Sequence, residues 1–197
     1  MTLKETVEIE AALRRNLAIE TLWLGWDQVQ LPNAWLVAGC LAQTVWNARF
    51  GLPTAHGISD IDLVYHDPSD LSEEAEQGHA DRIRQAFHEI DLWIDVKNEA
   101  CVHLWYASKF GYRIPPYTTV FDAIDTFPTT ATSVGVRPTE EGREVYAPFG
   151  LDDLMNGVVR PNKAQITQEI YEAKVARWLQ MWPDLTVVDW HAEDPSE

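Results

Sequence analysis

The sequence lacks the segments that mark membrane or secreted proteins. It has no run of 18 apolar residues, and its first sixteen residues, MTLKETVEIEAALRRN, contain no apolar core of the kind found in signal peptides. Only two cysteines are present, Cys40 and Cys101, and they form neither a disulfide framework nor a metal-type pair. These absences predict a soluble, cytoplasmic protein without a membrane partner.

Positive charge is scarce. Lysine and arginine total 15 against 31 aspartates and glutamates, so the formal net charge is −16. Proteins that bind long nucleic acids use clustered basic side chains to displace counterions from phosphates. We therefore expect no long nucleic acid as a partner. A small phosphorylated substrate remains compatible, because a metal ion and a few local cations suffice to hold it.

Two common catalytic motifs are also missing, namely the Gly-x-x-x-x-Gly-Lys phosphate loop and the Gly-x-Ser-x-Gly nucleophile elbow. Apolar residues, in contrast, make up 46% of the chain, enough for a substantial core. Nine tryptophans are many for this length. Core filling is the favoured interpretation, and stacking of one or two of them on a nucleobase is the alternative.

Short apolar runs alternate with helical patterns along the chain. We predict an N-terminal helix at about 3–25, a C-terminal helix at about 162–182, and a single domain over residues 1–197. Between these helices the patterns predict strands at 35–38, 60–65 and 92–97, helices at 40–49, 72–87, 99–110 and 120–127, a β-prone segment at 128–137, and an edge strand or loop at 146–149. This order predicts an α/β or α+β fold with a small mixed β-sheet flanked by helices.

Three acidic residues stand in predicted strands. Asp60 and Asp62 are two apart, which places both carboxylates on one face of a strand. Two such carboxylates repel each other, and a hard divalent cation such as Mg²⁺ offsets that repulsion. Asp95 lies between Ile94 and Val96 in the next predicted strand. If the strands are neighbours, Asp95 joins the other two, and we expect a site for Mg²⁺, or Mn²⁺ in its place.

Residues around these carboxylates are candidates for holding a phosphorylated ligand. Gly39 allows close approach to a phosphate, and a helix that starts at Cys40 offers free backbone N–H groups. Gln43 lies one turn into that helix, where either site contact or surface polarity explains it. Lys97 shares the face of Asp95, and either phosphate binding or carboxylate pairing explains it equally well. For His56 and Arg137, solvent exposure is the favoured interpretation.

The motifs VAGC (37–40), GISDIDL (57–63) and IDV (94–96) together resemble the signature of the DNA polymerase beta-like nucleotidyltransferase superfamily. More closely, the stretches AGCLAQTVWN, GISDIDLVYHD, WIDVKNEACVHLWY, PTTATSVGVR and FGLDDLMNGVVRPNK are similar to an uncharacterised bacterial nucleotidyltransferase family. These stretches span most of the chain, from about residue 36 to residue 163.

The resemblance implies a nucleotidyltransferase fold and a metal-dependent reaction. Asp60, Asp62 and Asp95 would bind the catalytic ions, and Asp95 would also help to deprotonate the acceptor. Gly39, the backbone at Cys40 and Ser59 of the Asp-x-Asp motif would contact the nucleotide. The partners implied are a nucleoside triphosphate and a hydroxyl on a small molecule or a protein. Cys40 departs from the superfamily, in which Gly or Ser is usual.

Two other functions fit parts of the pattern. A nucleotide- or protein-binding module without turnover is favoured by the substitution at Cys40. The three acidic residues oppose that interpretation, because a non-catalytic descendant has no need for carboxylates that repel one another. A sugar-nucleotide transferase of the Asp-x-Asp type uses the same metal chemistry, but it normally needs a larger nucleotide-binding domain.

Overall fold

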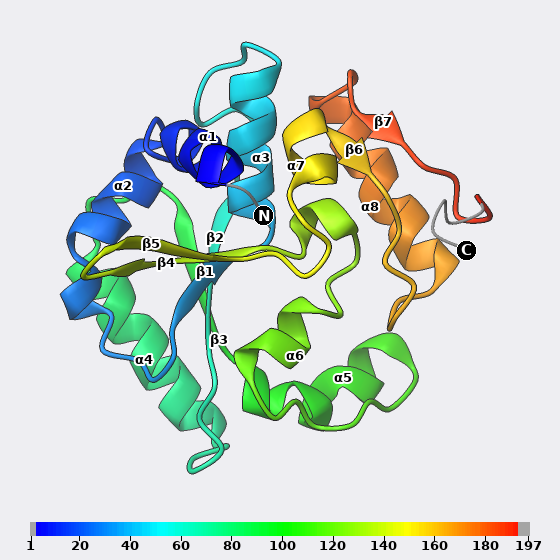
Figure 1. Cartoon of the computed structure of the whole chain (residues 1–197). Coiled ribbons are helices and arrows are strands. Elements are labelled where there is room, and N and C mark those ends of the chain that lie inside the picture. Colours follow the sequence, from blue (N-terminus) through cyan, green and yellow to red (C-terminus); the bar gives the residue numbers. More distant parts are fainter. Residues whose placement is uncertain (1–2, 193–197) are drawn as a thin grey trace.

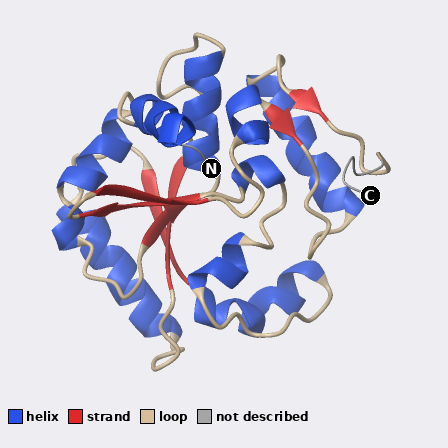
Figure 2. Ribbon diagram, viewed as in Figure 1, coloured by secondary structure: helices blue, strands red, loops and turns tan. Residues whose placement is uncertain are grey.

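A five-stranded mixed sheet forms the centre of the protein. The computed structural model describes residues 3–192, and Figure 2 shows the sheet surrounded by helices. The strands are β1 (Trp35–Val37), β2 (Asp60–Tyr65), β3 (Trp93–Asn98), β4 (Gly135–Thr139) and β5 (Gly142–Tyr146), in the spatial order β3-β2-β1-β4-β5. Strands β2 and β3 are parallel, whereas the other neighbours are antiparallel. The predicted mixed sheet flanked by helices is confirmed.

Helices and short 3-10 turns surround this sheet (Figure 1). They are α1 (Leu3–Leu13), α2 (Leu17–Leu24), η1 (Trp26–Gln28), α3 (Gly39–Arg49), α4 (Glu73–Ala86), η2 (Glu99–Cys101), α5 (Val102–Phe110), α6 (Val120–Ile124), η3 (Thr130–Thr132), α7 (Asp152–Asn156) and α8 (Gln168–Met181). Two short strands, β6 (Val158–Val159) and β7 (Thr186–Val187), pair in parallel beside α8. No helix within residues 3–192 is long and apolar enough to cross a lipid bilayer.

The two faces of the sheet are covered differently. Alternate residues of β2 and β3, including Ile61, Leu63 and Val96, are buried in the main core with side chains of α1 to α4. The opposite face carries a smaller cluster, in which Trp35, Val37 and Val64 pack against Val120 and Ile124 of α6. Because side chains alternate along a strand, Asp60 and Asp62 lie on this second face, next to the smaller cluster.

The N-terminal segment forms two helices rather than the single helix predicted at about 3–25. Helix α1 ends at Leu13 and α2 begins at Leu17. Asn16 causes the break, because its Oδ1 accepts hydrogen bonds from the backbone N–H groups of Ala18 and Ile19 as an N-cap. Its Nδ2 also donates to Thr44 Oγ1 on α3 at 2.9 Å, which fixes the corner against the core.

The C-terminal helix α8 begins at Gln168, six residues after the predicted start at about 162. Asn162 is engaged elsewhere, because its Nδ2 donates to the backbone oxygens of Asp125 (2.7 Å) and Phe127 (2.9 Å). The helix is fixed to α3 by aromatic contacts. The rings of Trp178 and Trp182 meet Trp46 edge-on, with centroids 5.5 and 5.7 Å away. These three tryptophans therefore fill the core, as the favoured interpretation predicts.

The segment before β4 differs from the prediction. The β-prone stretch 128–137 starts as the 3-10 turn η3, in which Thr129 caps the backbone N–H of Thr132, and only its end enters β4. The next strand, β5, ends at Tyr146, where the sequence predicts that an edge strand or loop begins. Gly142, with φ of 141°, opens β5 directly after the turn at Glu140 and Glu141.

Candidate active site

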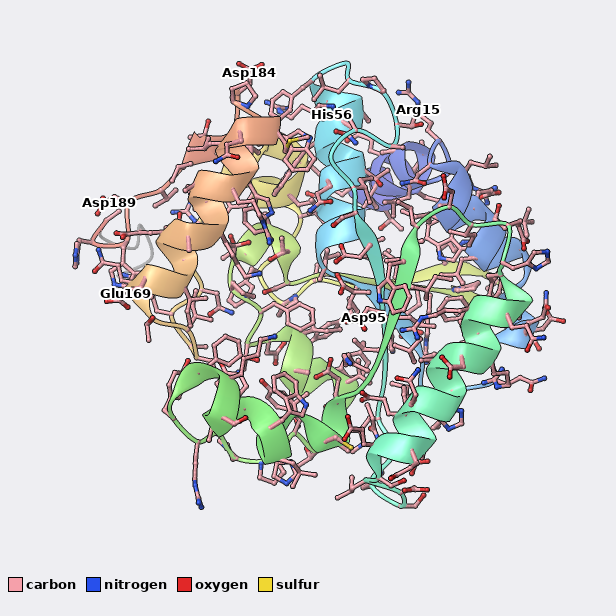
Figure 3. The ribbon with its side chains drawn as sticks, turned by 180° about the vertical axis from the view of Figure 1, so that it is seen from behind. Arg15, His56, Asp95, Glu169, Asp184 and Asp189 are labelled. Atoms are coloured by element: carbon pink, nitrogen blue, oxygen red, sulfur yellow. The ribbon has the colours of Figure 1, made fainter. Side chains whose placement is uncertain are left out.

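Asp62 and Asp95 are direct neighbours across two parallel strands. The register of β2 against β3 pairs Asp62 with Asp95 and Asp60 with Trp93. Paired residues of parallel strands point to the same face, so all three carboxylates leave the same face of the sheet. Figure 3 labels Asp95 on β3 in the middle of the molecule, between α8 and α4. The neighbouring strands that the sequence analysis requires are therefore present.

The carboxyl group of Asp62 sits in an unfavourable electrostatic environment. Burial raises its pKa to about 7, and the negative charges of Asp60 and Asp95 act in the same direction. Lys174 of α8 and a hydrogen bond from the Gly39 backbone oppose the rise. The site therefore concentrates negative charge at a half-buried position, where bound positive charge stabilises the ionised form.

The start of α3 lies against this carboxylate. A Cβ at Gly39 would be 3.8 Å from Asp62 Oδ2 and 3.3 Å from Gln43 Nε2, so a side chain at this position would narrow the approach to the carboxylate. The preceding residue, Ala38, has φ of 60° and ψ of −127°, a conformation that residues with a side chain rarely adopt. The backbone is thus strained where the free N–H groups of a helix meet the acidic residues.

The other predicted nucleotide contacts lie at different depths. Gln43 is 8% exposed, and its buried Oε1 has no hydrogen-bond partner among residues 3–192. The Cys40 side chain is completely buried in the main core, with Sγ 3.5 Å from the Val37 backbone oxygen. Only the backbone of Cys40 can therefore serve the site. Ser59 is exposed and donates from Oγ to Asp60 Oδ1 at 3.1 Å.

The basic candidates are held by acidic neighbours or rings. Lys97 Nζ lies 3.2 Å from Glu76 Oε1 and 3.7 Å from Asp95 Oδ1, so it pairs with carboxylates on both sides. Arg137 forms an ion pair with Glu144 at 2.7 Å and stacks over Trp35. His56 is also engaged, since its Nε2 lies 2.8 Å from the Met181 backbone oxygen.

The fit of a divalent cation depends on chemistry and on placement. Three carboxylates on one face, one of them with a raised pKa, provide the oxygen ligands that Mg²⁺ and Mn²⁺ prefer. In residues 3–192, however, no three His, Cys, Asp or Glu side chains are grouped closely enough to hold a metal ion as they stand. The donor set fits the cation, and its carboxylates would have to draw together around it.

Sequence reasoning missed a group of residues that the fold brings to the same place. A cavity of about 290 Å³ extends from Asp95 and is also lined by Glu99, Lys109 and Lys174. Lys174 comes from α8, 79 positions after Asp95, and its sequence context is that of a helix surface. Only the tertiary fold identifies it as a neighbour of Asp62 and Asp60. Burial lowers the pKa of the Lys174 ammonium group, and the charges of these two carboxylates oppose that shift in part.

Comparisons with known proteins identify the family of the chain. A family model described as "Nucleotidyltransferase" matches residues 25–187, a range that contains all three carboxylates and the start of α3. Among solved structures, one described as "The NMR structure of the protein reveals a CCA-adding enzyme head domain" superimposes with a TM-score of 0.75 at 25% sequence identity. That match covers 92% of this chain and 94% of the other. No curated protein matches the sequence. The chain belongs to a nucleotidyltransferase family.

Proposed function

We propose that this protein is a metal-dependent enzyme that moves a nucleoside monophosphate from a nucleoside triphosphate to a hydroxyl group, with release of pyrophosphate. The observation that carries the proposal is the placement of Asp60, Asp62 and Asp95 on one sheet face beside Gly39. Carboxylates, an open glycine and free helix N–H groups together suit phosphoryl transfer, which depends on positioning and charge stabilisation.

Each residue has a defined task in this proposal. Asp60, Asp62 and Asp95 hold Mg²⁺, or Mn²⁺, which when bound neutralises charge on the phosphates. Asp95 also accepts the proton of the attacking hydroxyl. The backbone N–H groups at Gly39 and Cys40 hold phosphate oxygens. Gln43, whose Nε2 lies beside Gly39, orients the nucleotide, and Ser59 supports Asp60 through the hydrogen bond described above.

The acceptor in this proposal is a small molecule or a protein side chain. The net charge of −16 disfavours a long nucleic acid, because the surface repels phosphate polymers. The proposed location is the cytoplasm, where nucleoside triphosphates are available.

Label transfer tests the proposal. The protein is incubated with each of four α-³²P-labelled nucleoside triphosphates and Mg²⁺, with a small-molecule extract or a protein fraction as acceptor. We expect release of unlabelled pyrophosphate and transfer of label to one fraction. Asp60→Asn and Asp95→Asn should each abolish transfer. The matched control is Asp91→Asn, at an exposed position outside the site, which should transfer normally. Full activity of Asp95→Asn would refute the proposed role.

A nucleotide-binding protein without turnover is the second candidate. It is favoured by the finding that no three acidic side chains of residues 3–192 stand in metal-binding proximity. Thermal shift with triphosphate and Mg²⁺ distinguishes the two functions when it is combined with the label assay. Binding without release of pyrophosphate from any of the four triphosphates would favour the second.

A further inference from the structure

A cavity beside Asp95 is lined by residues of β3, η2, α5 and α8 and of the segments on either side of α6. Its volume is about 290 Å³. This volume is close to the lower limit of the range found for small-molecule sites, so the cavity suits a compact ligand. Asp95 and Lys97 belong to its lining, and so do Thr126 and Gln165, which come from segments beyond α6 and before α8. The cavity therefore borders the proposed reaction centre.

Glu99 is the unusual residue in its lining. It is 6% exposed, and no hydrogen bond or ion pair of its side chain occurs among residues 3–192. A buried carboxyl group without a partner is costly, and such groups in native proteins call for an explanation. Burial raises the pKa of Glu99 to about 8, so near neutral pH the group can both donate and accept a hydrogen bond. The cavity is the space in which a ligand could meet it.

Further polar groups are already organised near Glu99. The hydroxyl of Tyr117 lies 2.7 Å from Thr126 Oγ1 and 3.0 Å from Gln165 Oε1. These three residues come from three separate segments and all line the cavity. Their hydrogen bonds fix the Gln165 carboxamide in place before any ligand arrives. A preorganised amide and an unpartnered carboxyl group suit the polar edge of a planar ring.

Aromatic side chains of α5 form one wall. Trp105 and Tyr106 have ring centroids 6.1 Å apart at 29°, and Tyr106 is 4.5 Å from Phe110. Trp105 is 36% exposed, so part of its ring is available for contact. Aromatic surfaces of this kind stack on nucleobases with little dependence on which base is present. The wall thus suits a flat ring, and the polar groups would distinguish one nucleobase from another.

Two lysines also line the cavity and bring positive charge to it. Neither Lys109 nor Lys174 forms an ion pair among residues 3–192, although acidic residues outnumber basic ones by two to one in the whole chain. The ammonium group of Lys109 lies 5.4 Å from the ring centroids of both Trp105 and Phe110. Lys174 lies near Asp62 and Asp60, and Lys109 lies beside Trp105, so the lining offers positive charge to a negatively charged ligand.

From these observations we infer that the cavity holds the nucleobase of the triphosphate, with the ring on Trp105 and its polar edge on Glu99 and Gln165. A nucleotide combines the three properties that the lining requires, namely a flat ring, a hydrogen-bonding edge and a negatively charged end. The inference rests on the proposed function for its choice of ligand. Its test uses nucleosides, which carry no phosphate and need no metal ion or turnover.

The experiment titrates the intact protein, labelled with ¹⁵N at its tryptophan indoles, with adenosine, guanosine, cytidine and uridine in turn. The Trp105 indole signal is assigned by its absence in Trp105→Phe. We expect at least one nucleoside to move this signal in a saturable way. Glu99→Ala should lower the affinity for that nucleoside about tenfold, which is the loss expected for one hydrogen bond to the ligand. It should also reduce the differences in affinity among the four nucleosides.

Two further variants show whether a loss of binding reflects the missing carboxyl group or a folding defect. Glu99→Gln keeps the size and hydrogen-bonding capacity of the side chain and should retain binding within about threefold. Glu73→Ala removes an exposed carboxylate of α4 outside the cavity and should bind as the wild type does. If the wild type releases pyrophosphate but no nucleoside moves the Trp105 signal, the cavity assignment is wrong and the proposed function stands. Equal affinity of Glu99→Ala and wild type for all four nucleosides would also overturn the inference.

Discussion

Gly39 at the start of α3 lies against the carboxylate of Asp62, close enough that a methyl group at position 39 would be 3.8 Å from Oδ2. The same methyl group would be 3.3 Å from Gln43 Nε2, the end of a side chain that can shift by a few tenths of an ångström. We predict that Gly39→Ala folds with a change in unfolding free energy below about 1 kcal/mol, because alanine favours the helix. Transfer activity should fall about 10- to 100-fold, since the added methyl group narrows the space through which a phosphate reaches Asp62.

A second glycine provides the matched control for this change. Gly78 lies within α4, and a Cβ there would meet no atom within 4 Å. Gly78→Ala should raise the unfolding free energy by about 0.5–1 kcal/mol and leave activity unchanged. Urea denaturation and the label-transfer rate are measured for both variants. Equal activity of Gly39→Ala and Gly78→Ala would contradict a phosphate site at Gly39.

Asp62 should make the metal-free protein less stable as pH rises. Its pKa is raised from 3.8 to about 7, so the folded state holds the proton more tightly than the unfolded state does. The unfolding free energy therefore falls between these two values and stays low above them. At pH 8 we expect Asp62→Asn to be about 1–2 kcal/mol more stable than the wild type, because the variant removes a negative charge that burial, Asp60 and Asp95 all disfavour. Added Mg²⁺ should stabilise the wild type more than the variant in denaturant titrations.

Glu99 should extend this pH dependence to higher pH. Burial, with smaller contributions from Glu76 and Asp62, raises its pKa from 4.5 to about 8. Stability contributed by the protonated group is complete below pH 4.5 and is lost as pH rises to about 8. Glu99→Gln should therefore reduce the slope of the unfolding free energy between pH 7 and pH 8, where Asp62 passes from half to mostly ionised and contributes a shrinking share of that slope. A slope unchanged from wild type in this interval would show that Glu99 titrates elsewhere.

Asn47 should be essential to the loop that leads into the site. It is completely buried, accepts a hydrogen bond from Trp182 Nε1 at 2.7 Å, and donates to the backbone oxygens of Thr54 and His56. Asn47→Ala leaves one buried indole N–H and two part-buried backbone oxygens unpaired, so we predict a loss of about 2–4 kcal/mol in unfolding free energy. The control is Asn156→Ala on α7, which removes one hydrogen bond of an exposed side chain. Its loss should be below about 1 kcal/mol.

Local patterns were sufficient to predict most of the sheet. Strand β2 and the Ser72 N-cap of α4 follow from alternation and capping chemistry, which act over a few residues. The break at Asn16 was missed, because Leu13 and Leu17 continue a helical spacing across it. Its cause is a cap combined with a contact to Thr44, 28 positions away. The strand β5 was misplaced for a similar reason, since its pairing with β4 defines it.

The candidate site was predictable only in part. Asp60, Asp62 and Asp95 stand out because charges in apolar strands are costly. Glu99 does not stand out, because a glutamate at a predicted helix start is ordinary in sequence, and its burial appears only in the folded chain, where it lines a cavity with residues distant in sequence. Lys174 similarly looks like a surface residue of α8. Long-range packing determines both positions, and a single sequence carries no direct record of it.

The most direct test of the central claim locates the metal ion. A crystal of the protein grown with Mn²⁺ and a non-hydrolysable triphosphate is measured at the manganese absorption edge. Our account predicts an anomalous peak within about 2.0–2.3 Å of carboxylate oxygens from Asp60, Asp62 and Asp95. A peak bound elsewhere, or a bound triphosphate with no metal near these three residues, would contradict it.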